Sequence, residues 1–306
     1  RVTDNSFHAL AEAGCGQQLT SLSLSCLEMG VTDSGLQSLV KAGCGPQLTT
    51  LEFEDLSQKA TIVGLRMLAE AGCGMQLTSL VLDNTDSLPS VSDEELCALA
   101  KAGCGAALTS LTLFALNERV TDKGICALAK AGCGAHLTSL ALLDLKEGVT
   151  DDGLLALVSA GCGPRLTLLF LDSLCDAVTD KCFHSLSGAG CGPHLTSLHL
   201  GNLSERVTDD GLCALAMAGC GAELTALTLW GLKEGVTDRG LKSLAQAGCG
   251  ARLRSLHLEG LREGVTDNGL AALADAGCGE KLTLLHLDCL MNRVTEAGLE
   301  RLAGAG

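Results

Sequence analysis

The sequence predicts an α/β solenoid, a right-handed horseshoe with a parallel sheet on its concave face and helices on its convex face. The first observation is a fixed period, because the segment A-G-C-G-x-x-L-T-S-L-x-L recurs along the chain of 306 residues, and such periodicity is typical of stacked repeats. The second is that each period contains one strand pattern and one helix pattern. A single unit cannot bury its own leucines, so neighbouring units must stack.

One cysteine marks the period, since it returns every 29 residues with a single step of 31 between Cys73 and Cys104. The two extra residues fall in the segment 83–90, which follows a strand and is expected at the rim of the concave face. We call the repeated cysteines the cysteine ladder: Cys15, Cys44, Cys73, Cys104, Cys133, Cys162, Cys191, Cys220, Cys249 and Cys278.

The strand of each unit is indicated by strict alternation. In the segment 19–25, Leu22 and Leu24 point to one side, and Ser21, Ser23 and Ser25 point to the other. Parallel strands stack about 4.8 Å apart, whereas the helices behind them need about 8–10 Å. This mismatch bends the stack so that the strands line its inside.

The helix of most units begins at V-T-D, although one unit has Thr61-Ile62 in place of Thr-Asp. In the template unit we expect Thr32 or Asp33 to cap the helix, with the carboxylate near the positive end of the helix dipole. Apolar residues between 36 and 40 form the buried stripe, and Gly43 ends the helix in the left-handed conformation. Gly35, early in the helix, also recurs in most units, so we expect one backbone to approach another there.

The repeat L-x-x-L-x-L, followed by V-T-D-x-G-L-x-x-L-A-x-A-G-C-G, resembles the cysteine-containing leucine-rich repeats found beside F-box domains and in mitotic-exit regulators. The period of 29 residues is nearer to the ribonuclease-inhibitor type, at the long end of the range of about 20–29 for such repeats. The family's Asn or Cys after the strand is replaced by leucine, as at Leu27. The resemblance implies a protein-binding fold with a concave recognition face.

Composition narrows the function classes. The net charge is −15, with 36 acidic against 21 basic residues, which disfavours nucleic acid and anionic membranes as partners. No run of 18 apolar residues occurs, so no membrane span is expected. The chain contains no catalytic motif, which predicts that it is not an enzyme and has no cofactor. Residues 1–306 read as one domain of about ten and a half repeats from a longer chain.

Cysteine usage indicates the redox compartment. The chain has 17 cysteines, an odd number, and no C-x-x-C pair. A thiol repeated at one core position packs as a small apolar group and needs no bonded partner. We therefore predict buried, reduced thiols in an intracellular (cytoplasmic or nuclear) protein, with Cys26 and Cys289 as the most reactive of them.

The candidate recognition residues lie on the strands, at the positions between and after the leucines, where the repeats vary most. They form three zones on the concave face. The acidic zone comprises Glu52, Glu54, Asp55, Asp83 and Asp86. The apolar middle comprises Phe114, Leu143, Leu168 and Phe170, with Trp230 two strands beyond Phe170 and the polar Asp172 and His199 at the same variable positions. The polar cluster comprises His257, Glu259, His286 and Asp288.

These zones lead to a leading hypothesis and several alternatives. Exposed aromatic residues in a concave surface are typical binding anchors, so we expect a non-enzymatic scaffold that binds another protein there. The alternatives are a substrate-recognition or regulatory arm (ubiquitin-ligase-like or GTPase-activating) of a larger protein, a purely structural assembly, and variation without selection. End-to-end self-association through open strand edges is also expected. For the histidine cluster, contact with a partner or plain surface is favoured over metal binding.

Overall fold

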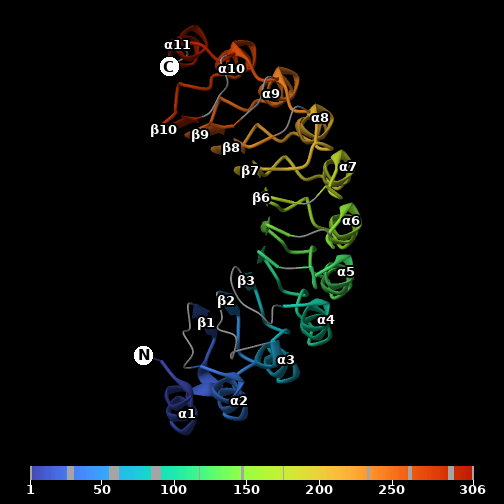
Figure 1. Ribbon diagram of the computed structural model, residues 1–306, viewed down its shortest axis with the longest axis vertical. Coiled ribbons are helices and arrows are strands. Elements are labelled where there is room, and N and C mark those ends of the chain that lie inside the picture. The colour runs from blue at the N-terminus through green and yellow to red at the C-terminus, as the bar shows by residue number, and fades with distance from the viewer. Residues whose placement is uncertain are drawn as a thin grey trace. The chain divides into compact units, whose positions relative to one another are not determined.

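The computed structural model describes residues 2–25, 31–54, 62–83, 91–116, 118–145, 148–174, 176–232, 235–260, 264–288 and 293–304. Within these residues strands and helices alternate along the chain (Figure 1). The chain forms two compact units, Arg1–Leu137 with Asp144–Gly161 and Thr138–Leu143 with Cys162–Gly306. A single domain over residues 1–306 stays a prediction.

The first unit contains four described strands that pair in parallel in chain order. The strands are β1 (Ser21–Ser25), β2 (Thr50–Glu54), β3 (Ser79–Asp83) and β4 (Ser110–Phe114). The helices are α1 (Asp4–Glu12), α2 (Asp33–Lys41), α3 (Ile62–Glu70), α4 (Asp93–Lys101), α5 (Asp122–Lys130) and α6 (Asp151–Ser159), with a short 3₁₀ helix η1 (Cys15–Gln18).

The second unit contains six described strands, also parallel and in chain order. The strands are β5 (Ser139–Leu143), β6 (Leu168–Asp172), β7 (Ser197–Gly201), β8 (Ala226–Trp230), β9 (Ser255–Glu259) and β10 (Leu284–Asp288). The helices are α7 (Asp180–Gly188), α8 (Asp209–Met217), α9 (Asp238–Gln246), α10 (Asp267–Asp275) and α11 (Glu296–Gly304). Among the described residues no helix is both long and apolar enough to cross a membrane.

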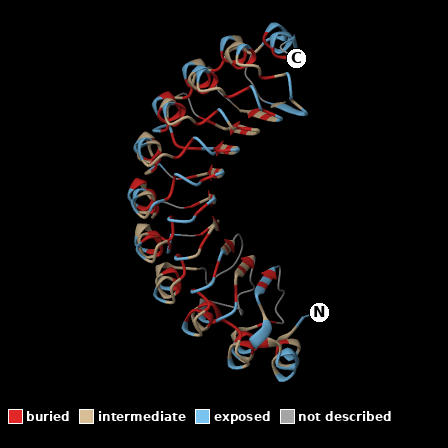
Figure 2. Cartoon of the chain, turned by 180° about the vertical axis from the view of Figure 1, so that it is seen from behind, coloured by how far each residue is buried: buried red, intermediate tan, exposed pale blue. Residues whose placement is uncertain are grey.

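The core of each unit lies between its strands and its helices, as the alternation predicts. The two leucines of β3, Leu80 and Leu82, are fully buried, and the residues between and after them are half-buried. Figure 2 shows the same alternation on the strands of the second unit. Each leucine buried in this way stabilises the fold by about 1.5–3 kcal/mol. Strand β10 departs from the pattern, because Leu284 and Leu285 on it are 54% and 48% exposed.

The helix starts differ from the expectation in the origin of the carboxylate that bonds them. Thr32 is the N-cap of α2, and its hydroxyl oxygen accepts the backbone N–H of Ser34. The carboxylate that bonds the start of α2 comes from Asp4, one repeat earlier, which accepts the N–H of Thr32 at 2.8 Å and of Gly35 at 3.1 Å. The Thr32 hydroxyl donates to the same carboxylate at 2.7 Å. The first repeat therefore supplies an acceptor to the next one.

This arrangement recurs along both units, and we call it the aspartate ladder. Asp33 bonds Gly64 in the same way. Further members, each followed by the threonine that it bonds, are Asp93 with Thr121, Asp122 with Thr150, Asp180 with Thr208, Asp209 with Thr237, Asp238 with Thr266, and Asp267 with Thr295.

The aspartate ladder also explains the glycine early in the helix. A Cβ at Gly35 would lie 2.6 Å from Asp4 Oδ1, and one at Gly153 would lie 2.5 Å from Asp122 Oδ1. We expected a glycine here because two backbones would lie close together, and that reason was wrong. The close neighbour is a carboxylate, which needs room to accept the N–H groups of the helix start.

Glu95 tests this explanation within the chain itself. It occupies the glycine position of its repeat, and the preceding repeat has Ile62 where the ladder aspartate would be. Its own carboxylate accepts the N–H of Ser92 at 3.0 Å and the Ser92 hydroxyl at 2.6 Å, forming a capping box. The larger residue thus stands where the ladder aspartate is missing and supplies the acceptor from inside the repeat.

The cysteine ladder lies in the cores of the two units, as predicted. Of its ten members, all within the described residues, nine are buried and Cys15 is partly exposed. Burial raises the pKa of Cys44 to about 11 and that of Cys162 to about 12, so these free thiols stay protonated. Cys26 and Cys289, expected to react first, lie outside the described residues.

Candidate recognition surface on the open face of the sheet

The face of each unit's sheet that points away from the helices is called the open face here. The sequence predicted that the variable strand positions lie on it, and the burial pattern is consistent with this, because in β2 to β5 those positions are half-buried between buried apolar residues. In β6 the last of these positions, Asp172, is buried. The open face therefore presents side chains that are fixed to a packed framework. Asp55 and Asp86, and most of the inserted segment 83–90, lie outside the described residues.

In the first unit the open face carries three carboxylates, those of Glu52, Glu54 and Asp83, among small polar residues. Glu52 and Glu54 lie two residues apart on β2, so they share one face of that strand. Val81 of β3 pairs with Glu52, and Asp83 of β3 pairs with Phe114 of β4. All but Val81 are sequence-predicted site residues, and all are half-buried. The aromatic residue Phe114 and the acidic residue Asp83 therefore occupy paired positions on neighbouring strands.

In the second unit the structure brings four predicted residues into contact. We call Phe170, Asp172, His199 and Trp230 the aspartate–indole cluster. The Trp230 Nε1–H donates to Asp172 Oδ2 at 2.8 Å, and His199 Nε2 lies 3.0 Å from the same oxygen. The Phe170 ring stacks on the His199 imidazole, with centroids 3.6 Å apart and planes 10° from parallel. Leu143, on the neighbouring strand β5, pairs with Asp172.

This contact corrects two expectations about Trp230. We expected its side chain to stand exposed two strands beyond Phe170, but the indole reaches back across β7 and is half-buried. Asp172, expected as a surface carboxylate, is 9% exposed. Gly201 on β7 makes this possible, because a Cβ there would lie 1.9 Å from Trp230 Nε1. The signal was present in the sequence as Asp172, Gly201 and Trp230 at one strand position in three successive repeats.

The charge of the cluster is set by its hydrogen bonds. Burial alone would raise the pKa of Asp172, but hydrogen bonds from His199, Ser173 and Trp230 outweigh it and lower that pKa below its usual value. The Ser173 hydroxyl donates to the second carboxylate oxygen at 2.7 Å. Trp230 Nε1 also lies 3.2 Å from His199 Nε2.

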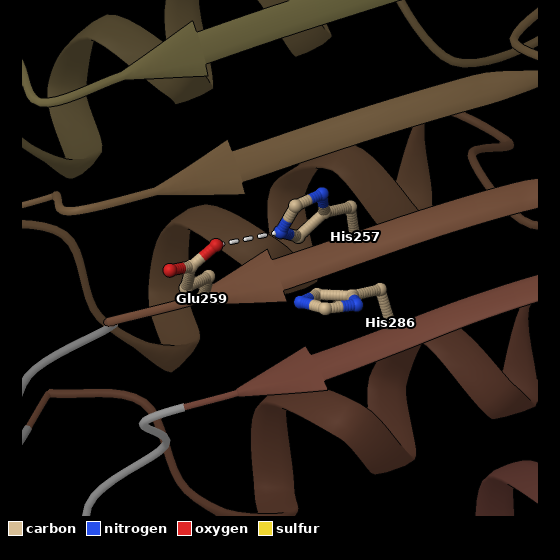
Figure 3. A group of neighbouring side chains, drawn as sticks. All are labelled: His257, Glu259 and His286. Carbon is tan, nitrogen blue, oxygen red and sulfur yellow. Dashed lines mark hydrogen bonds and ion pairs between the residues drawn. The ribbon is translucent and has the colours of Figure 1, made fainter.

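The polar cluster predicted near the end of the chain is also assembled. His257 Nε2 lies 2.9 Å from Glu259 Oε2, and the rings of His257 and His286 have centroids 4.2 Å apart. Figure 3 shows the three side chains projecting together from β9 and β10. Asp288 pairs with Glu259 in the sheet register and is exposed. Nitrogen and oxygen ligands are therefore gathered on one patch of the open face.

Comparison with known proteins bears on the fold. No family model and no curated protein matches the chain. A chain from the crystal structure of the Rad7 and Elc1 complex in yeast is similar, with 18% identity and a TM-score of 0.56 over 97% of this chain and 86% of that chain. LegL7 from Legionella pneumophila, a leucine-rich repeat-containing protein, shares 16% identity over 95% of this chain and 92% of its own, with a TM-score of 0.42.

The first likeness shows the fold alone at this level of identity, and the second is too weak in TM-score to carry an argument. The described strands are all parallel and alternate with helices. Buried leucines occupy the same two strand positions in β1 and in β3 to β9, and in β2 the second of these positions holds the buried Phe53. This protein is an α/β repeat solenoid of the leucine-rich type, with a parallel sheet.

Proposed function

We propose that this protein is a non-enzymatic scaffold that binds another protein on the open face of its sheet. The aspartate–indole cluster is the observation that supports it most. Phe170 and Trp230 are half-buried aromatic side chains on strands whose leucines are fully buried. Aromatic residues are the commonest anchors of protein interfaces, and side chains held before binding lose little conformational entropy on binding. Asp172 holds the Trp230 indole in this way.

The partner that fits this face has an apolar anchor flanked by basic groups. Carboxylates lie on the open face of both units, with Glu52 and Glu54 in the first and Glu259 in the second. The net charge of −15 would steer a basic partner toward the protein. The same charge argues against nucleic acid and anionic membranes as partners. Self-association through open strand edges stays a prediction.

The cysteine-containing subclass and an intracellular location belong to the same proposal. The buried cysteine ladder supports the subclass, since its thiols occupy one core position in successive repeats. Free thiols such as those of Cys44, Cys162 and Cys220 are typical of proteins in reducing compartments. A second candidate function is a recognition or regulatory arm within a larger assembly. It is favoured by the likeness to a chain whose crystal structure is that of a two-protein complex.

Site-specific photocrosslinking tests the proposal. A benzophenone amino acid would replace Thr228, which lies on β8 beside His199 in the register. The matched control would carry it at Met217 on α8, which is 88% exposed. In extracts of the source cells we expect a protein adduct from position 228 and none from position 217. Adducts from position 217 alone would contradict the proposal and favour an outer-face contact.

A further inference from the structure

The sheet register places two histidines and a glutamate at one point of the open face. His257 on β9 pairs with His286 on β10, and Glu259 follows His257 by two residues, which keeps both on the same face of β9. One ligand atom from each of the three residues lies within 4.8 Å of the other two. Within the described residues, no other group of three His, Cys, Asp or Glu side chains meets this condition.

The present geometry is close to that of a coordination sphere. A tetrahedral site with bonds of about 2.0–2.2 Å separates its ligand atoms by about 3.3–3.6 Å. His257 Nε2 and Glu259 Oε2 are 2.9 Å apart, so an ion between them requires these two atoms to separate by less than about 1 Å. His286 is exposed, and its ring is tilted at 60° to that of His257. The site is completed when the His286 ring approaches the other two ligand atoms.

The charges nearby favour a cation. Asp288 pairs with Glu259 in the register and adds a second carboxylate to the same patch. On the other side, β8 places Thr228 beside His257 and Trp230 beside Glu259, and neither is basic. A bound dication would meet two carboxylates across the register. The imidazole nitrogens decide which cation is preferred.

We propose that His257, Glu259 and His286 bind a divalent transition-metal ion of the Zn²⁺, Co²⁺ or Ni²⁺ class. Imidazole ligands suit these ions, whereas Mg²⁺ and Ca²⁺ prefer sites made of oxygen atoms. Two histidines and one glutamate form a ligand set known from zinc proteins in which water holds the remaining position. This inference does not depend on the proposed protein partner.

The aspartate–indole cluster shows what distinguishes this site. There a histidine and a carboxylate also lie in contact, His199 with Asp172. However, the Asp172 carboxylate already accepts hydrogen bonds from Trp230 and Ser173 and is buried. It also has no second histidine among the residues that bond it. The pair of His199 and Asp172 is therefore structural, whereas the pair of His257 and Glu259 can bind an ion.

Calorimetric titration of the whole chain with Zn²⁺ tests the proposal. We expect one ion per chain, with affinity lowered at least ~100-fold in H257A/H286A and ~10-fold or more in E259Q, since even residues behind metal ligands change affinity by about 10–100-fold. The control is His184→Ala, which removes an exposed histidine on α7. Its affinity should equal that of the parent. Circular dichroism would show that each variant is folded.

Titration with Co²⁺ separates this site from binding to thiols, because the chain has 17 cysteines. The proposal requires a visible d–d spectrum without a sulfur-to-cobalt charge-transfer band, and loss of that spectrum in H257A/H286A. Equal affinity in the parent and H257A/H286A would overturn it. A thiolate band that persists in the variant would overturn it as well.

Discussion

Asp122 Oδ1 in one repeat accepts the backbone N–H of Gly153 in the next repeat at 2.9 Å. The same oxygen accepts the N–H of Thr150 at 2.8 Å, and the Thr150 hydroxyl donates to Oδ2 at 2.7 Å. One side chain thus satisfies donors at the start of a neighbouring helix, donors that the helix itself cannot bond. The aspartate ladder therefore joins repeats by polar contacts on the helix side, as the leucines join them in the core.

Replacing Asp122 by alanine should destabilise the first unit. Thr150 and Gly153 would each keep a partly buried N–H without its acceptor, and such a loss costs about 1–3 kcal/mol per group. We expect a loss of about 2–4 kcal/mol in total, measured by urea unfolding. The control is Glu94→Ala, which removes an exposed first-turn carboxylate on α4 and should cost less than about 1 kcal/mol. Equal losses of stability in the two variants would mean that Asp122 acts only through the helix dipole and not through its hydrogen bonds to the next repeat.

Gly153→Ala should be destabilising for a reason that depends on Asp122. The new Cβ would lie 2.5 Å from Asp122 Oδ1, so the carboxylate must move. In the Asp122→Ala background this clash disappears, and the alanine should then be neutral or stabilising by up to about 1 kcal/mol. Gly188→Ala on α7, where a Cβ meets nothing within 4 Å, is the control. Additive effects of the two substitutions in urea unfolding would refute this coupling.

The sequence predicts the repeated elements more completely than the contacts between them. Strands, helices and the buried cysteine ladder follow from local periods of two and 3.6, which short segments such as 19–25 and 36–40 display by themselves. The aspartate ladder was missed because the contact partners of Asp4 lie 28 and 31 residues away. A carboxylate beside a helix start also has an adequate local explanation in the helix dipole.

The candidate site was predicted in position but not in arrangement. The variable residues could be assigned to the open face from alternation alone, and the pairing of His257 with His286 follows from the register. The conformation of Trp230 could not be predicted in the same way, because it depends on the missing side chain at Gly201 and on the acceptor Asp172. A side chain that reaches across a neighbouring strand cannot be predicted from the pattern of a single repeat.

Acid should disrupt the aspartate–indole cluster below pH 4. The folded-state pKa of Asp172 is lowered, whereas an unfolded aspartate titrates near about 3.9. The stabilisation is therefore complete above about pH 4 and is lost as the pH falls through the lower folded-state pKa. Trp230 is the single tryptophan, so its fluorescence reports the transition. We expect a midpoint below about 3.9 that is absent in Asp172→Asn. A midpoint above that value would disprove the assignment.

The buried cysteine ladder should resist thiol reagents in the native protein. Burial raises the pKa of Cys104, Cys162 and Cys249 to about 12, and only the thiolate is reactive. Among the described cysteines, the partly exposed Cys97 and Cys213 should be labelled before the buried members of the ladder. Mass spectrometry of partly labelled protein measures the order. Equal labelling rates at all sites would contradict a buried ladder.

Cys162→Ser should be costly, because the more polar hydroxyl would be buried in the core. We expect a loss of about 1–3 kcal/mol in urea unfolding. Cys97→Ser, at a partly exposed position on α4, is the matched control and should change stability by less than about 0.5 kcal/mol. If both substitutions lower the free energy of unfolding equally, burial does not explain why cysteine recurs at this position.

Binding to the open face is the central claim, and titration of a purified crosslinked partner against variants tests it most directly. Phe170→Ala and Trp230→Ala, each shown to be folded by circular dichroism, should weaken binding by about 2 kcal/mol or more, which is about 30-fold in affinity. Lys130→Ala on α5 and Met217→Ala on α8 change exposed helical residues and should leave affinity unchanged. An affinity that follows Lys130 and Met217 and ignores Phe170 and Trp230 would contradict the claim.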